Sequence, residues 1–492
     1  MEEAVDQSEK AANGESRFSY SSFYRKDLGY DPASPESIAT YGHELVGKTF
    51  GYVCEEAIQY DSASPDLYRR EKAKAAKGQL GQLVEFYHFH RKPNSDPRPD
   101  FPEAGVELKV TPFRVVGEHR YSAKERLVIT IIDFFRLIDE SFESSHFWIK
   151  ARLMLLVFYE FEKELSKLQY RIRYVQLFTP PEDDLPTIRS DWERIQEKVR
   201  LGLAHELHCS DTVYLEACPK GANRSSLRPQ PKSPLPAMQR AFAFKSSYMT
   251  YVLNRDVVPH GEEYERILPK GERCSVEEYA LRKIGAERGA DEADLFRRYG
   301  VRTKAKNSHA SLVFRILGIR NNRAEEFVKA GIEVKTLRLR KDGMPKEDMS
   351  FPVFRFKDVA EEEWDTAEIA DRFRETRFLF VAFREDGSGI LRLAGATFWS
   401  MPYADLEVRY REVWERTRAV IRSGRPCWTD ERGRRHSAFP RKTESPVGHV
   451  RPHGRDAMDT DLLPNGTAFT KQCFWLNRDY IRKQLGPEIT KG

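Results

Sequence analysis

Two stretches of the chain, one in each half, share a six-residue motif and the spacing of a carboxylate in front of it. The motif AGVELK begins at Ala104 and returns as AGIEVK at Ala330, and Asp100 and Glu326 each stand seven residues before the glutamate of the motif. Further matching segments follow in the same order: 152–158 with 377–383, 191–194 with 413–416, and 218–221 with 451–454. A repeat of this length predicts two homologous domains rather than a solenoid. The 492 residues are also too many for a single hydrophobic core.

The repeat and the local patterns together predict the organisation of the chain. We expect a disordered polar tail at 1–16, a first domain at 17–254, a helical linker at 255–305 and a second domain at 306–492. Apolar runs predict buried strands within 126–133, 153–159 and 170–178, and a helical period predicts a helix within 184–203. The sequence therefore indicates a mixed α/β fold around a central sheet.

Composition narrows the class of protein. A net charge of +5 permits nucleic-acid binding without demonstrating it. The six cysteines are scattered without a C-x-x-C pair, which favours reduced thiols in the cytoplasm over a disulfide framework or a zinc site. No signal-peptide pattern or membrane-length apolar run is present, so we expect a soluble cytoplasmic protein without a membrane partner.

The first copy of the motif has the residues of a metal-dependent phosphodiesterase. Glu107 and Lys109 alternate along a predicted strand and so point the same way, and Asp100 stands at the strand entrance. Two carboxylates with substrate phosphate and water suit a magnesium ion, Mg²⁺. An adjacent ammonium can orient the attacking water or stabilise charge on the phosphate. Taken alone, the motif fits an ion pair on an exposed strand better.

A basic tract with interleaved aromatic residues follows the predicted sheet of the first domain. Lys220 lies between a proline and a glycine, in a loop that presents its side chain outward. Other candidates for DNA contacts in this tract are Asn223, Arg224, Lys245 and Tyr248. A solvated charged loop with aromatic residues in a helix core explains this segment equally well.

Several spaced motifs occur in the order of a known family. Lys77-Gly78-x-x-Gly81-x-x-x-Glu85 is followed by the segment from Asp100 to Lys109, then Lys150, then Pro219-Lys220-Gly221. This pattern resembles the MutH-like endonucleases, which include the nicking enzyme of mismatch repair and type II restriction endonucleases that cut at GATC.

The resemblance implies a fold, a cofactor and a site. The family fold is a restriction-endonuclease core with two lobes around a DNA cleft, so two such domains in tandem are expected. Mg²⁺ would be held by Asp100 and Glu107, with Glu85 completing the metal site or its outer shell. The implied catalytic set is Glu85, Asp100, Glu107, Lys109 and Lys150, and Lys220 matches a lysine that contacts the target bases.

Two departures from the family pattern concern DNA reading. Cys218 stands where MutH has an arginine, and Ala243 stands where MutH has a tyrosine that senses adenine methylation. The resemblance therefore leaves the response to methylated DNA open.

The second copy has changed at other positions. Phe314 takes the place of Glu85, and Glu375 falls where Lys150 lies, so we expect a catalytically silent domain that binds DNA through Arg451 and His453. The restriction enzymes of the group carry such a second copy.

The reading that follows is a type II restriction endonuclease that hydrolyses double-stranded DNA at GATC, with a homodimer on DNA or one chain acting twice. A mismatch-repair nicking enzyme and a DNA-binding regulatory protein with a silent nuclease fold remain as alternatives.

Overall fold

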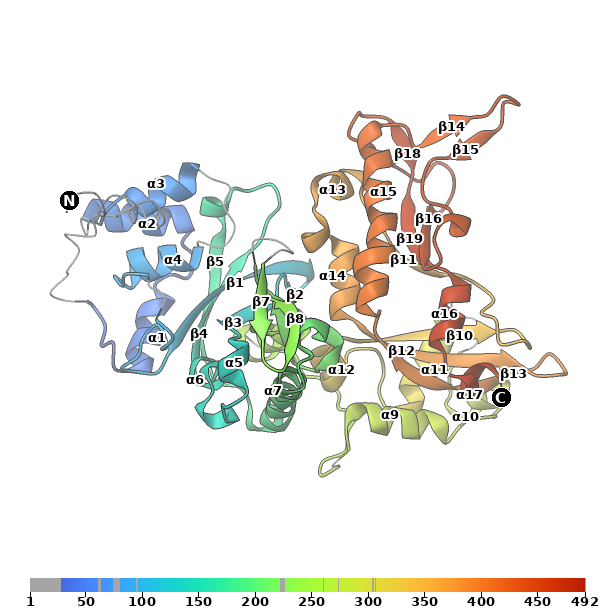
Figure 1. The fold of residues 1–492 in the computed structure, drawn as a ribbon, viewed down its shortest axis with the longest axis horizontal. Helices are drawn as coiled ribbons and strands as arrows, with labels where there is room; N and C mark the ends of the chain where they lie inside the picture. Colours follow the sequence, from blue (N-terminus) through green and yellow to red (C-terminus); the bar gives the residue numbers. More distant parts are fainter. Residues whose placement is uncertain are drawn as a thin grey trace, which may run out of the picture. The chain divides into compact units, whose positions relative to one another are not determined.

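The computed structural model describes residues 28–60, 63–73, 80–93, 96–221, 226–259, 261–272, 274–302, 305 and 307–491. The described chain divides into two compact units (Figure 1). Unit 1 comprises the described residues up to Val115 and from Trp148 to Pro180, and unit 2 comprises the rest. The boundary between the two compact units does not coincide with the boundary between the two sequence repeats. Part of the first repeat packs with the second repeat and belongs to unit 2.

Unit 1 contains three strands of a four-stranded sheet, with helices packed against them. Its helices and strands are α1 (Pro35–His43), α2 (Phe50–Tyr60), α3 (Asp66–Ala73), α4 (Leu80–Leu83), β1 (Glu107–Gly117), α6 (His146–Ala151), β4 (Met154–Glu160) and β5 (Arg171–Phe178), with β1 and α6 lying across the boundaries of the unit. Strand β1 runs parallel to β4, which pairs antiparallel with β5. The strands predicted within 153–159 and 170–178 are confirmed.

Burial explains the order of layers in unit 1. The first five residues of β4 are all buried, as a strand covered on both faces requires. Helix α1 packs against β5, and Ser34 caps its N-terminus by accepting the backbone N–H of Ser37 at 3.2 Å. Phe101, Leu155 and Val175 are fully or almost fully buried in the same core. This core fixes the entrance of β1, where the predicted carboxylates lie.

The remaining part of the first repeat, residues 116–147 and 181–258, belongs to unit 2 and is called the first-copy lobe. Its helices and strands are β2 (Arg120–Ala123), β3 (Leu127–Ile131), α5 (Phe134–Leu137), α7 (Leu185–Arg200), β6 (Leu215–Pro219), β7 (Leu227–Gln230), β8 (Ser233–Met238), β9 (Arg240–Phe244) and α8 (Ser246–Val252). The strand order β3-β9-β6 is antiparallel throughout, and β7 and β8 form a separate hairpin.

Residues 307–491 of unit 2 form the second copy, which is preceded by the two connecting helices. The helices are α9 (Val276–Gly285), α10 (Glu292–Arg298), α11 (Ser308–Ile316), α12 (Glu325–Ala330), α13 (Phe356–Glu361), α14 (Glu368–Glu375), α15 (Arg411–Ser423), α16 (Arg478–Gln484) and α17 (Pro487–Thr490). The strands are β10 (Ile332–Leu339), β11 (Met349–Val353), β12 (Arg377–Glu385), β13 (Leu391–Trp399), β14 (Cys427–Thr429), β15 (Arg435–Ser437), β16 (Gly448–Pro452), β17 (Thr460–Leu462), β18 (Ala468–Thr470) and β19 (Gln472–Leu476).

The two copies repeat one topology. Strand β10 runs parallel to β12, which pairs antiparallel with β13, as β1, β4 and β5 do in unit 1. The order β11-β19-β16 repeats β3-β9-β6. Gly105 and Gly331 stand two residues before the motif glutamate, at φ +68° and +63°, a left-handed conformation that costs glycine little. The predicted mixed α/β fold with a tandem duplication is confirmed.

Helix α8 of the first-copy lobe packs against α12 of the second copy. Ser246 donates a hydrogen bond to the carboxylate of Glu375, and Ser247 donates to the carbonyl of Lys329 at 3.1 Å. Since these contacts join residues of both repeats, the lobe and the second copy form one body.

A buried cluster of charges, here called the Lys329 junction, lies beside this contact. It consists of Asp184, Tyr248, Glu325 and Lys329. The ammonium of Lys329 donates to Asp184 at 2.6 Å and to Glu325 at 2.7 Å, and Tyr248 donates to the other oxygen of Asp184 at 3.0 Å. Lys329 is 3% exposed, so its charge depends on these carboxylates.

None of the helices in the described part of the chain is both long and apolar enough to cross a membrane.

Candidate active site

The start of strand β1 brings four of the five predicted catalytic residues together in unit 1. The carboxylate of Glu107 accepts a hydrogen bond from Lys109 at 2.8 Å and from Lys150 at 3.1 Å to each oxygen. Asp100 is fixed by the backbone N–H of Leu108, which donates to its carboxylate at 2.9 Å. The backbone N–H of Asp100 in turn donates a hydrogen bond to the carboxylate of Glu107 at 3.3 Å. The predicted convergence is therefore present.

Local folding explains these positions. Alternation along the extended strand places Glu107 and Lys109 on one side, as predicted. Phe101 and Val106 pair across a tight turn that ends in Gly105, which returns Asp100 to the strand. Lys150 lies in the last turn of α6, just before β4, and the register pairs Glu107 with Met154. Because β4 runs parallel to β1, Lys150, just before β4, lies beside the carboxylate of Glu107.

The electrostatics of the site favour a cation. Burial, reinforced by the nearby charges of Asp100 and Glu107, raises the pKa of Glu85 to about 8. Burial and the charge of Glu107 also raise the pKa of Asp100 above its usual value. Glu107 is itself only 2% exposed. Carboxylates that repel one another in a buried site are stabilised when a divalent ion binds between them.

The donor set fits a hard cation that keeps part of its water shell. No group of three or more His, Cys, Asp or Glu side chains arranged to enclose a metal is found among the described residues. A full protein cage is therefore absent from that part of the chain. Mg²⁺ uses one or two carboxylates with water and substrate phosphate, and Asp100 with Glu107 supplies such a pair.

The described part of the predicted DNA-reading loop, residues 219–221, is exposed in the first-copy lobe. Lys220 follows β6, is exposed, and its backbone N–H donates to the carbonyl of Gln239 at 2.8 Å. Asp191 of α7 holds the start of β6 by accepting the backbone N–H groups of Val213, Tyr214 and Leu215 at 2.6–3.0 Å. Asn223 and Arg224 lie outside the described residues.

Lys245 and Tyr248 differ from expectation. Lys245 is 6% exposed and donates to the carbonyl of Thr212, whereas Tyr248 is fully buried and donates to Asp184. Both side chains point into the lobe, because β9 and α8 form its core at this point. The prediction that these two residues contact DNA is corrected: they support the fold of the lobe.

The second copy keeps the motif without the convergence. Glu333 is paired with Lys335 and with Arg372, each at 2.7 Å. Glu326 is on helix α12 and accepts the backbone N–H groups of Ile267 and Leu268 at 3.0 and 3.1 Å. The carboxylate that sequence spacing matched to Asp100 is therefore committed to holding the connecting segment.

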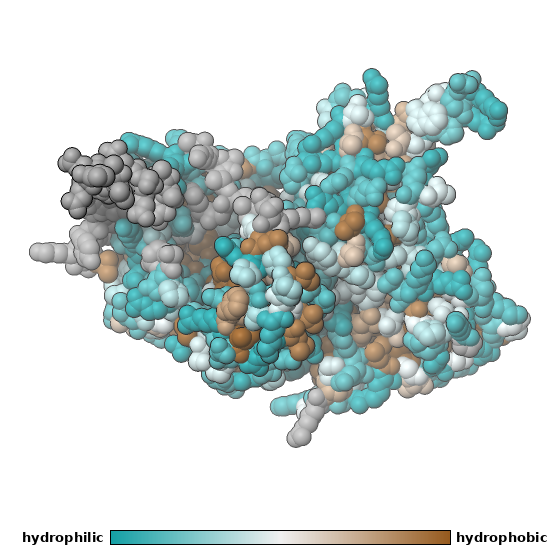
Figure 2. Space-filling view, in the orientation of Figure 1, coloured by the Kyte–Doolittle hydropathy of each residue, from teal (hydrophilic) through white to brown (hydrophobic). Residues whose placement is uncertain are grey.

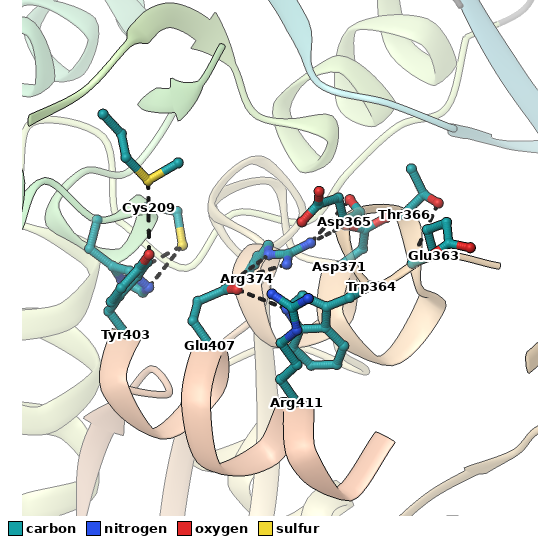
Figure 3. A network of polar contacts seen from close by, with 12 residues as sticks. Cys209, Glu363, Trp364, Asp365, Thr366, Asp371, Arg374, Tyr403, Glu407 and Arg411 are labelled. Carbon is teal, nitrogen blue, oxygen red and sulfur yellow. Dashed lines mark hydrogen bonds and ion pairs between the residues drawn. The ribbon is translucent and has the colours of Figure 1, made fainter. Parts of the chain in front are cut away.

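The second copy has no lysine that corresponds to Lys150. The residue at the corresponding place is not Glu375, as the sequence spacing predicted. The register pairs Glu333 with Phe378, as it pairs Glu107 with Met154, so the residue at the offset of Lys150 is Arg374. Figure 3 shows Arg374 pointing to Glu407, to which it donates at 2.8 and 3.1 Å. The placement of Glu375 at this point is corrected, since its carboxylate accepts from Ser246.

Arg451 and His453 are exposed at the end of β16, as a DNA contact requires. The guanidinium carbon of Arg451 lies 3.7 Å from the ring centre of Trp475, and His453 packs edge-on against the same ring at 5.2 Å. Sequence spacing placed these two residues but missed the tryptophan that orients them, because Trp475 is contributed by the neighbouring strand β19.

Comparison with known proteins finds a match to the same family model in each of the two copies. The family model described as DNA mismatch repair enzyme MutH matches residues 89–191 and again 317–407. The type II restriction enzyme Sau3AI of Staphylococcus aureus is 34% identical over 465 residues, which cover 85% of this chain and 94% of that protein.

Shorter relatives match about half of the chain. The DNA mismatch repair protein MutH of Vibrio cholerae is 24% identical over 227 residues, 46% of this chain and 97% of that protein. MutH of Shigella flexneri is 28% identical over 199 residues, 40% of this chain and 80% of that protein. Among these relatives, the restriction enzyme is the one that matches most of this chain, whereas each MutH protein matches less than half.

Proposed function

Because the chain belongs to the family of type II restriction enzymes that includes Sau3AI, we propose that it hydrolyses both strands of DNA at GATC in the presence of Mg²⁺. The observation that carries the proposal is the convergence of Asp100, Lys109 and Lys150 on Glu107. The order of the MutH-like motifs, with Lys220 in the exposed loop, supports GATC as the site. The expected location is the cytoplasm, where the DNA substrate lies.

The residues of the site divide the work of hydrolysis. Asp100 and Glu107 would hold the ion, with Glu85 beside them. Bound Mg²⁺ would supply a Lewis acid that acidifies water and neutralises phosphate charge. Lys109, part-buried and paired with Glu107, would orient the attacking water. Lys150, 8% exposed, would stabilise charge on the phosphate.

The direct test is incubation of the purified chain with plasmid DNA and Mg²⁺, followed by sequencing of the ends. Linear products with ends at GATC are expected. Nicked circles alone would indicate a repair-type enzyme, and no cleavage at all would contradict the proposal. Since the second copy lacks the convergent site, two chains meeting on the palindrome, or one chain acting twice, would cut both strands.

Lys220→Ala is expected to reduce discrimination between GATC and random DNA by about 1–3 kcal/mol, because a lysine can donate to the O6 or N7 of guanine. Binding of GATC and scrambled duplexes would be compared by fluorescence anisotropy. Lys270→Ala, which removes an exposed lysine from the connecting segment, is the matched control. An equal loss of affinity for both duplexes would make Lys220 a phosphate contact only.

The double substitution Glu333→Ala with Lys335→Ala is expected to leave the cleavage rate within a factor of about three of the unmodified protein, since neither residue lies in a site that can hold the ion and the water. Initial rates on plasmid DNA would be measured at saturating Mg²⁺. If cleavage disappears while folding and DNA binding persist, the second copy is a working nuclease.

A further inference from the structure

The second copy contains a hairpin that the first copy lacks. Strands β14 and β15 pair antiparallel between α15 and β16, within residues 424–447. The corresponding connection of the first-copy lobe, residues 201–214 between α7 and β6, contains only two short 3₁₀ turns. The hairpin also lies beyond residue 407, where the second match to the MutH model ends. In Figure 1 it projects past α15 and β18 of the same unit.

The hairpin is internally ordered. Trp428 stands opposite His436 in the register, and the two rings stack at 4.5 Å with an interplanar angle of 22°. The carboxylate of Asp430 is bonded to Nε2 of His436 at 2.9 Å and accepts the backbone N–H groups of Arg432 and Arg434. A shape held in advance reduces the entropy lost on binding.

The indole of Trp428 has no place in the core. It is 53% exposed, and its ordered neighbour is another hairpin side chain. A single exposed apolar residue is ordinary in a protein surface. An ordered tryptophan on a projecting hairpin becomes informative when the same hairpin carries more basic than acidic residues, as this one does despite Asp430 and Glu431 in its turn.

Arginines of two kinds lie in this region. Three on α15 are paired with acidic side chains: Arg411 with Glu415, Arg416 with Glu444 and Arg418 with Glu363. The arginines Arg425, Arg432 and Arg434 are exposed, and none has an acidic partner among the described residues. Figure 2 shows a hydrophilic surface at the hairpin end. Guanidinium groups without an acidic partner, on the same hairpin as an exposed indole, match the sugar–phosphate backbone of DNA.

We propose that the β14–β15 hairpin is a second DNA-binding element, which contacts the backbone of duplex DNA independently of base sequence. Arg432 and Arg434 neutralise phosphates, and Trp428 packs against the sugars. The inference rests on the proposed function, in which duplex DNA is the substrate, and adds a contact distinct from Lys220 and Arg451.

The test uses the full chain carrying Glu107→Ala, so that DNA stays intact, and a long duplex with one GATC. Arg432→Ala with Arg434→Ala is expected to reduce the slope of log affinity against log salt by about 2, since each phosphate contact contributes about 0.9. Trp428→Ala is expected to weaken DNA binding about tenfold, because less apolar surface is then buried when DNA binds. Hydroxyl-radical footprints should lose protected sugars outside GATC and keep protection at GATC.

The matched control is Arg297→Ala with Arg298→Ala, which removes two arginines of α10 that are paired with acidic residues. Charge reversal, Arg432→Glu with Arg434→Glu, should strengthen the effect, and equal melting temperatures would show intact folding. Unchanged affinity, salt slope and footprint would overturn the inference. So would a change in self-association by sedimentation without a change in DNA binding. Absence of cleavage by the unmodified chain, with hairpin effects on binding present, would contradict the proposed function alone.

Discussion

Replacing Glu107 by alanine is expected to reduce the rate of DNA cleavage by at least about 10³-fold while DNA binding persists. Glu107 is the acceptor for both lysines of the site, so its loss removes a proposed metal ligand and releases both ammonium groups. Asp100→Ala and Lys109→Ala are expected to have similar effects. Single-turnover cleavage in Mg²⁺ and anisotropy on a GATC duplex would separate chemistry from binding.

The matched control for these variants is Glu103→Ala. Glu103 is an exposed glutamate of the same turn and contributes no contact to Glu107. Its loss should leave the cleavage rate nearly unchanged. If Asp100→Ala, Glu107→Ala or Lys109→Ala cleaves at close to the unmodified rate, the assignment of the site is wrong.

The second large effect concerns stability. Lys329→Ala is expected to lower the free energy of unfolding by about 3–5 kcal/mol, because it leaves the carboxylate of Asp184 buried without its cation. Asp184 is 2% exposed and would keep only Tyr248 as a side-chain donor. Urea unfolding followed by circular dichroism would measure the change.

Two further variants identify the cause. Arg297→Ala removes an exposed pair and should change the free energy of unfolding by less than about 1 kcal/mol. Adding Asp184→Asn to Lys329→Ala should recover part of the loss, since no buried charge then remains. A loss below 1 kcal/mol for Lys329→Ala would show that the junction does not hold the two repeats together.

Much of the fold follows from local patterns in the sequence. The continuous apolar run before Tyr159 predicts a strand covered on both faces, and β4 is such a strand. The alternation of Glu107 and Lys109 predicts their shared direction because a strand has a period of two. These features depend on neighbouring residues, so they are readable without the tertiary structure.

The second copy shows where spacing fails. Glu326 stands seven residues before Glu333, as Asp100 stands before Glu107, yet it lies on a helix that turns its carboxylate toward the connecting segment. An equal spacing along the chain does not predict where a side chain points when the local conformation is a turn in one copy and a helix in the other. Lys245 differs from expectation for a related reason, since a cation near aromatic residues in sequence can be folded inward when a carbonyl such as that of Thr212 accepts its hydrogen bond.

The Lys329 junction bears on whether the first copy can fold alone. A shortened gene ending near residue 254 would produce a first-copy lobe whose α8 had lost its packing partner and whose Asp184 had lost its cation. Such a product is expected to fold poorly, whether or not the second copy contacts DNA. The second copy is therefore a structural support of the first-copy lobe as well as a candidate for binding DNA.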